Sequence, residues 1–317
     1  MNILITGGAG FIGSNLTERL LREGHEIICL DNFDDFYDPQ RKRKNLETAL
    51  KDSRFRLYEG DLRDEAFLEK IFSAEKIENV AHLAARAGVR PSIRFPALYA
   101  DVNIRGTLNL LESCRRHGVR RFVFASSSSV YGNNPKVPFS ETDSVDNPIS
   151  PYAATKKAGE LICHTYHHLY GLDVACLRYF TVYGPRQRPE MAIHQFTRLI
   201  HHGKKITLIG DGNSRRDYTF IDDAVAGTVS ALRRENGFEI FNIGESQTTT
   251  LIELVRIIEE RVGKKALIEY LPAQPGDVER TFADIQKAKE KLEYKPQTDM
   301  RAGIQKFVDW YLSEGKK

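Results

Sequence analysis

The sequence of 317 residues contains little cysteine and no long apolar run. Its four cysteines form no C-x-x-C pair, so a zinc site has no support. Cys29, Cys163 and Cys176 stand among apolar neighbours and are predicted to be buried. No apolar stretch reaches the ~18 residues of a membrane span, and the N-terminus lacks the basic region of a signal peptide. We therefore expect a soluble, cytoplasmic protein with no membrane partner.

The chain also lacks a strong charge of either sign. Lys and Arg number 46 against 43 Asp and Glu, a net charge of +3. A dedicated nucleic-acid binder would usually carry a basic stripe, so we expect no nucleic-acid partner. The balance still permits one local basic pocket for an anionic ligand.

Short apolar runs alternate with helical patterns over the first 178 residues, which predicts βαβ units and a parallel sheet. The runs are apolar throughout, as in strands covered on both faces. The fold class is thus α/β, a Rossmann-type doubly wound parallel sheet. The predicted strands are 2–5, 26–30, 55–59, 79–83, 121–125 and 173–178. One helix is predicted to begin at residue 11, and two longer helices are predicted over 97–117 and 151–170.

Glycines at the end of the first strand indicate a dinucleotide site. Gly7-x-x-Gly10-x-x-Gly13 joins this strand to the first helix, whose N-terminus can bind a pyrophosphate. Asp31 closes the second strand and can accept hydrogen bonds from ribose hydroxyls, which favours NAD over NADP. Asp61 closes the third strand and can either bind the adenine amine or cap the following helix.

Beyond residue 180 the pattern loosens into short strands and helices. We expect an NAD-binding domain over 1–178, with about 219–246 returning to it, and a smaller mixed α/β substrate-binding domain over 179–317. The predicted strands of this part are 207–209, 218–221, 239–242 and 267–270, and the predicted helices are 221–234, 250–262, 284–291 and 300–314.

A catalytic pair is predicted at the start of the helix over 151–170. Tyr152 and Lys156 are four residues apart, so both side chains lie on one face of this helix. A free phenol titrates near ~10, and a nearby ammonium group would favour the phenolate. Four serines, 126–129, end the preceding strand.

Together, the glycine motif, Asp31, the serines before Val130-Tyr131-Gly132, and the Tyr152/Lys156 pair resemble the extended short-chain dehydrogenases/reductases. The resemblance covers the whole chain and implies that Tyr152 is the acid/base, Ser127 the catalytic hydroxyl and Lys156 a ribose ligand. It implies contacts to NAD from Gly7, Gly10, Phe11, Ile12, Gly13, Asp31, Asn32, Asp61, Leu62, Leu83, Ala84, Ala85, Asn103, Tyr152, Lys156 and Tyr179. It also implies a homodimer in which the helices over 97–117 and 151–170 pair.

The choice among family members depends on two stretches. Dehydratases and decarboxylases of the family usually carry acidic residues where Ser128 and Ser129 stand, which favours a 4-epimerase here. The run from Thr181 to Arg188 is similar to UDP-glucuronate 4-epimerases, and a sugar carboxylate would need such donors. The resemblance implies UDP-sugar contacts from Ser127, Ser128, Ser129, Thr181, Arg186, Arg188, Arg216 and Asp277.

Three alternatives remain open at this stage. A UDP-glucose/UDP-galactose 4-epimerase would use the same catalytic residues without a carboxylate site. A UDP-glucuronate decarboxylase or dehydratase is disfavoured by the two serines. An inactive NAD-binding regulatory module is disfavoured by the intact catalytic set. Gln274 departs from the arginine that family members often carry, and Arg86 and Arg90 flank a loop near the site without an assigned role.

Overall fold

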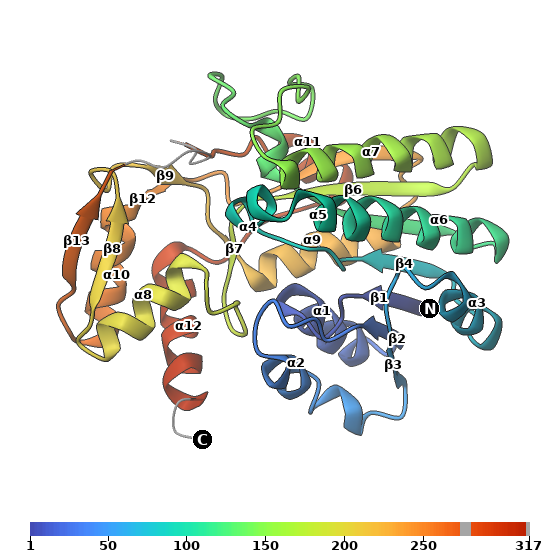
Figure 1. Cartoon of the computed structure of the whole chain (residues 1–317), viewed down its shortest axis with the longest axis horizontal. Helices are drawn as coiled ribbons and strands as arrows, with labels where there is room; N and C mark the ends of the chain where they lie inside the picture. Colours follow the sequence, from blue (N-terminus) through green and yellow to red (C-terminus); the bar gives the residue numbers. More distant parts are fainter. Residues whose placement is uncertain (273–279, 315–317) are drawn as a thin grey trace.

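A seven-stranded parallel sheet forms the centre of the computed structural model, which describes residues 1–272 and 280–314 (Figure 1). The strand order is β11-β6-β5-β4-β1-β2-β3, which confirms the predicted Rossmann-type sheet. The chain order reverses between β1 and β4, where such sheets bind ligands. The strands are β1 (Asn2–Thr6), β2 (Glu26–Asp31), β3 (Phe55–Glu59), β4 (Asn79–His82), β5 (Arg121–Ser127), β6 (Asp173–Tyr179) and β11 (Phe238–Ile243).

Helices cover both faces of this sheet because its strands are apolar on both sides. In β1, Ile3 and Ile5 join the core under α1 and α9, whereas Leu4 joins the core under α3, α6 and α7. Alternate side chains of a strand point to opposite faces, which explains the continuous apolar runs in the sequence. These helices are α1 (Phe11–Arg22), α3 (Glu65–Ala74), α6 (Gly106–Arg116), α7 (Pro151–Tyr170) and α9 (Ile221–Arg233).

The helix α7 spans the predicted residues and is defined at both ends by the sequence. The Ser150 hydroxyl accepts a hydrogen bond from the Ala153 amide at 3.1 Å, and Pro151 occupies the first helical position. Gly171 ends the helix with a φ of +69°. These signals place Tyr152 and Lys156 in the first two turns, at the carboxyl end of β5.

The helical stretch predicted over 97–117 is confirmed in extent, since residues 96–116 are helical without a break, but it is not one regular α-helix. The structure has α5 (Pro96–Ala100), a π-helical turn (Asp101–Arg105) and then α6. The π turn carries the buried Asn103, whose amide bonds both backbone groups of Arg86, at 2.8 and 3.0 Å. An apolar pattern does not reveal this change of hydrogen bonding, because the turn remains helical in outline.

The C-terminal part forms a smaller unit beyond the carboxyl ends of the large sheet, to the left in Figure 1. Its strands β8 (Lys205–Ile209) and β13 (Leu267–Leu271) pair in parallel, and α8 (Ala192–His201) packs on α10 (Leu251–Val262). Two further short pairs form separate two-stranded sheets: β7 (Val182–Tyr183) with β10 (Thr219–Phe220), and β9 (Arg215–Arg216) with β12 (Thr249–Thr250). The remaining elements are α2 (Pro39–Asn45), α4 (Val89–Arg94), α11 (Gln286–Leu292), α12 (Met300–Glu314) and the 3₁₀ turns Ala49–Lys51 and Ser128–Tyr131.

Two further findings concern the cysteines and the length of apolar helices. All four cysteines are free and buried, as predicted for Cys29, Cys163 and Cys176. Within 1–272 and 280–314, no helix has the length and apolar character needed to cross a membrane.

Candidate active site

The turn between β1 and α1 depends on two glycines. Gly7 has a φ of +69°, and a Cβ at this position would lie 2.8 Å from the Ala84 nitrogen. A Cβ on Gly13 would lie 2.2 Å from the Gly7 carbonyl oxygen. Only glycine therefore allows the turn to approach the end of β4 and α1 to pack against the turn.

A first cavity opens at the carboxyl ends of β1, β2, β3 and β4. The described residues that line it do not include Gly10, Phe11, Ile12 and Gly13. Gly10 is the N-cap of α1 and the other three form its first turn, whose N-terminus can bind phosphate. The predicted cofactor residues that line the cavity are Gly7, Asp31, Asn32, Asp61, Leu62, Leu83, Ala84 and Ala85.

Asp31 is held in place by the backbone around it. Its carboxylate accepts hydrogen bonds from the amides of Ala9 at 3.1 Å and Phe33 at 2.9 Å. Burial raises the pKa of Asp31, and the charge of Lys42 opposes this rise. A fixed carboxylate at the end of β2 can bind two ribose hydroxyls and would repel a 2′-phosphate, so the residues present fit NAD.

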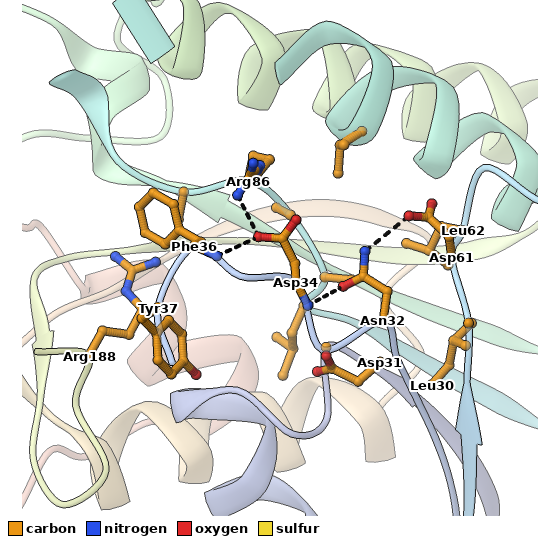
Figure 2. Close-up of a pocket in the computed structure, with 17 residues that line it drawn as sticks. Leu30, Asp31, Asn32, Asp34, Phe36, Tyr37, Asp61, Leu62, Arg86 and Arg188 are labelled. Atoms are coloured by element: carbon orange, nitrogen blue, oxygen red, sulfur yellow. Dashed lines mark hydrogen bonds and ion pairs between the residues drawn. The ribbon is translucent and has the colours of Figure 1, made fainter. Parts of the chain in front are cut away.

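Asp61 lies beside Asn32, whose amide donates to it at 3.0 Å (Figure 2). Hydrogen bonds from Arg63 lower the pKa of Asp61 to about 2. The alternative that Asp61 caps the following helix is wrong, because Asp64 accepts from the Phe67 amide and caps α3.

The structure brings Ser127, Tyr152 and Lys156 together at the end of β5. The Lys156 ammonium donates to the Ala125 carbonyl oxygen at 2.8 Å and lies 6.0 Å from the centre of the Tyr152 ring. Burial lowers the pKa of Lys156 to about 8. Burial also raises the pKa of Tyr152, whereas a hydrogen bond with Ser127 and the charge of Arg188 lower it. The group can therefore transfer a proton at an atom bound near Ser127.

A second cavity adjoins this group and collects most of the predicted substrate residues. Its lining also includes residues that the sequence did not predict, among them Phe36, Glu190 and Thr281. The aromatic pair Phe36–Tyr37, which begins five residues after Asp31, was a visible signal, but an isolated Glu or Thr in a loop gives none. The predicted residues that line this cavity are Ser128, Ser129, Thr181, Arg188 and Arg216, together with Arg90.

Three predicted residues contact other parts of the protein instead. Arg186 forms an ion pair with Glu18 of α1 at 2.5 Å, and it is absent from the described lining of both cavities. The Tyr179 hydroxyl bonds that of Thr228 at 2.7 Å, and Asn103 holds the backbone of Arg86. Asp277, like Gln274, lies outside the described residues.

The loop after β2 closes over the first cavity. Asp34 forms an ion pair with Arg86 at 2.5 Å and also accepts from the Phe36 amide at 2.8 Å. Figure 2 shows Phe36 between Arg86 and Arg188. Each guanidinium carbon lies 5.6 Å from the centre of the Phe36 ring. Phe36 and Arg188 line both cavities and thus form their shared wall.

The glycine turn, the parallel sheet and the Ser127/Tyr152/Lys156 group define an extended short-chain dehydrogenase/reductase. The sequence model of the GDP-mannose 4,6 dehydratase family matches residues 4–307, and the chain belongs to this family.

Several relatives in this family are 4-epimerases. A UDP-glucuronate 4-epimerase of Thermodesulfobacterium geofontis is 46% identical over 309 residues, which cover 97% of this chain and 95% of the relative. The Bacillus cereus UDP-glucuronic acid 4-epimerase, in complex with UDP-glucuronic acid and NAD, is 37% identical with a TM-score of 0.93, covering 99% and 100% of the two chains. The UDP-glucose 4-epimerase of Thermotoga maritima, with UDP-glucose, is 38% identical with a TM-score of 0.91, covering 99% of each chain.

Proposed function

We propose that this protein is an NAD-dependent UDP-sugar 4-epimerase that converts UDP-glucuronate to UDP-galacturonate. The observation that carries the proposal is the second cavity, which is lined by Arg188 and Thr181 together with the serines 128 and 129 beside the catalytic group. This cavity offers a cation for a sugar carboxylate and has no acidic side chain at the two serine positions. The 46% identity to a UDP-glucuronate 4-epimerase supports the same substrate.

In the proposed reaction, Tyr152 takes the proton of the sugar 4-hydroxyl and Ser127 positions that hydroxyl. Lys156 binds the cofactor ribose, and its ammonium, 6.0 Å from the centre of the Tyr152 ring, favours the ionised form of the phenol. NAD, when bound, supplies the acceptor for the C4 hydrogen and returns it. Between removal and return of this hydride, the 4-keto sugar would rotate in the site, so that C4 is reduced from its opposite face and Tyr152 gives its proton back to the 4-oxygen. No net oxidation occurs, so no external reductant is needed.

The sugar carboxylate would be held by Arg188 and the Thr181 hydroxyl. A charge-assisted hydrogen bond contributes about 1.5–3 kcal/mol, or roughly a factor of ten to a hundred in discrimination. Because the 4-keto intermediate of glucuronate is a β-keto acid, fixing its carboxylate also opposes loss of CO₂. Arg186 is a weaker candidate, since it pairs with Glu18 of α1 and is not among the described residues that line the second cavity.

The other predicted residues receive proposed roles by position. Arg216 lines the second cavity and its planar guanidinium suits the diphosphate of the substrate. We propose Asp277 as a contact to the nucleotide, and the residues of the first cavity and the start of α1 as contacts to NAD.

We also propose an NAD-binding unit of 1–178 with 219–246, and a substrate-binding unit over the rest of 179–317.

We further propose a cytoplasmic homodimer. Both α6 and α7 carry exposed apolar side chains: Leu108, Leu161, Leu169 and Tyr170. Such a surface is typical of a protein contact. The free state of all four cysteines fits a reducing compartment.

The test is incubation of the purified protein with NAD and UDP-glucuronate, without reductant, and identification of the products by proton NMR. We expect UDP-galacturonate, with no pentose and no net NADH. Turnover of UDP-glucose alone would leave the mechanism in place and remove the carboxylate site. A UDP-pentose or 4-keto pentose product would show that the serines at 128 and 129 do not exclude decarboxylation. Inertness toward all UDP-sugars would favour a regulatory NAD-binding module.

A further inference from the structure

The guanidinium that is proposed to bind the substrate carboxylate already has a carboxylate partner. Arg188 Nε lies 2.9 Å from Glu190 Oε1, and both residues line the second cavity. Glu190 follows Arg188 by two residues in the same loop, before α8 begins. The protein therefore presents a carboxylate of its own at the position where a uronate carboxylate would bind.

The pair lies at the junction of the two cavities. The Arg188 guanidinium packs over the Phe36 ring, in the shared wall (Figure 2). Its charge lowers the pKa of the Tyr152 phenol, so the guanidinium is within electrostatic range of the catalytic group. Burial raises the pKa of Tyr37, and the charges of both Arg188 (lowering) and Glu190 (raising) also act on it, so both charges lie near this ring.

The Arg188–Glu190 ion pair is more exposed than another ion pair of the same fold, so a ligand can displace it more easily. Glu160 and Arg178 are each 1% exposed and share two hydrogen bonds, at 2.8 and 2.9 Å. The Glu190 side chain is 43% exposed and that of Arg188 is 22% exposed. An exposed carboxylate loses little hydration by forming such a pair, and the pair is correspondingly weak.

We propose that Glu190 is an internal counter-ion of Arg188, which the carboxylate of a UDP-uronate displaces when it binds. This inference rests on the proposed function. Exchange of one carboxylate for another keeps the guanidinium neutralised in both states. A sugar with an uncharged hydroxymethyl group cannot make this exchange, and it must bind beside an intact ion pair. Glu190 is thus a specificity-determining residue that lowers the affinity for every ligand competing for Arg188.

The experiment compares Glu190→Gln with the parent protein, both carrying Tyr152→Phe so that substrate is not consumed and both loaded with NAD. Titration calorimetry measures the dissociation constants of UDP-glucuronate and UDP-glucose. We expect Glu190→Gln to tighten UDP-glucuronate about twofold to fivefold, as for loss of a competing exposed ion pair. The constant for UDP-glucose should change less than about twofold by the same argument.

Glu18→Gln is the matched control, because it removes the ion pair of Arg186 in the same loop without touching Arg188. It should change neither constant. The inference is overturned if Glu190→Gln leaves the ratio of the two constants unchanged, or if it weakens UDP-glucuronate, because Glu190 would then orient Arg188 instead of competing for it.

The proposed function has a separate readout in the same titrations. If the parent protein does not prefer UDP-glucuronate to UDP-glucose, the carboxylate site itself is wrong and the counter-ion role falls with it. A clear preference in the parent protein, unaltered by Glu190→Gln, would overturn the counter-ion role alone.

Discussion

The Tyr152 phenol is subject to opposing influences on its pKa. Burial raises the pKa, since the charged form loses hydration, whereas the Ser127 hydrogen bond and the Arg188 charge lower it. The ammonium of Lys156 and a bound nicotinamide would act in the lowering direction. A phenol that is a poor base in water can thus approach its operating range only in the assembled site.

Tyr152→Phe tests this role. We expect kcat to fall by about 10²- to 10⁴-fold, the usual contribution of a general acid/base, while NAD remains bound. Epimerisation followed by NMR, with NAD content measured on the denatured protein, gives both quantities. Tyr166→Phe removes another phenol of α7, one bonded to Glu112, and should retain activity. Normal turnover by Tyr152→Phe would assign the proton transfer to another group.

Two acidic side chains outside the site, Glu245 and Asp217, have raised pKa values. Burial and the neighbouring Asp223 and Asp217 raise the pKa of Glu245 to about 8, and burial raises that of Asp217 to about 7. Asp217 accepts three backbone hydrogen bonds, but the buried Glu245 Oε2 has no hydrogen-bond partner among the described atoms. Glu245 therefore favours the protonated form in the folded chain.

This predicts a pH-dependent gain from Glu245→Gln. Between its ordinary pKa of 4.5 and about 8, folded Glu245 holds a proton that the unfolded chain releases, so wild-type stability falls as pH rises. The variant should match wild type near pH 5 and exceed it at pH 9 by on the order of 1–3 kcal/mol. Urea unfolding at both pH values measures the difference. The exposed Glu47→Gln should show no such gain, and an equal gain at both pH values would contradict the argument.

At the scale of elements, the ion pair Asp34–Arg86 joins the loop between β2 and α2 to the segment after β4. The Arg86 backbone is in turn fixed by Asn103 of the π turn. The loop therefore covers the first cavity while tied to a rigid support. A covered cofactor suits an epimerase, which must retain NAD between removal and return of the same hydrogen.

Asp34→Asn should therefore speed the loss of NAD. We expect the dissociation rate to rise by roughly threefold to tenfold, since a partly buried pair contributes about 1 kcal/mol. The rate can be followed by trapping released NAD with a coupled dehydrogenase. Glu59→Gln, which breaks the exposed pair of Glu59 with Arg43 of α2, is the matched control. Equal rates in Asp34→Asn and wild type would show that the ion pair does not retain the cofactor.

The elements also show what the sequence could predict. Strong periodicity with capping residues identified α7 to the residue, and the apolar runs located the first six strands of the sheet within two residues. The helix α8 was missed, although it buries Ile193, Phe196 and Ile200, because its ends carry no side-chain caps. Two-residue strands such as β7 and β9 have no pattern of their own and arise from the chain around them.

The site residues show the same difference between regular elements, which could be predicted, and loops, which could not. Positions at strand ends or on a helix face, such as Asp31, Tyr152 and Lys156, could be predicted because regular structure fixes where their side chains point. The loop residues Phe36, Glu190 and Thr281 could not, because only folding brings their segments together. The sequence likewise did not reveal that Arg186 is engaged by Glu18, 168 positions earlier in the chain.

For the whole molecule, the proposed dimer makes a prediction about α7. Leu161 is 56% exposed, and Leu161→Asp would place a charge within the apolar contact. We expect the mass measured by light scattering to fall to that of a single chain, because burial of an unpaired carboxylate is costly. Leu267→Asp changes an equally exposed leucine on β13 and should leave the mass unaltered. Dissociation by Leu267→Asp instead would move the interface to the C-terminal unit.

The central sheet is completed by a segment from late in the chain, and this order has a consequence for biosynthesis. The edge of β6 and the face beneath α9 are completed only by residues 221–243, after β7, α8 and β8 have been made. A nascent chain that ends near residue 200 thus exposes an unpaired apolar strand, a template for association with other chains. Premature termination or slow translation in this interval should direct the product to chaperones or to aggregates, even though every residue of the glycine turn and the catalytic group has already emerged.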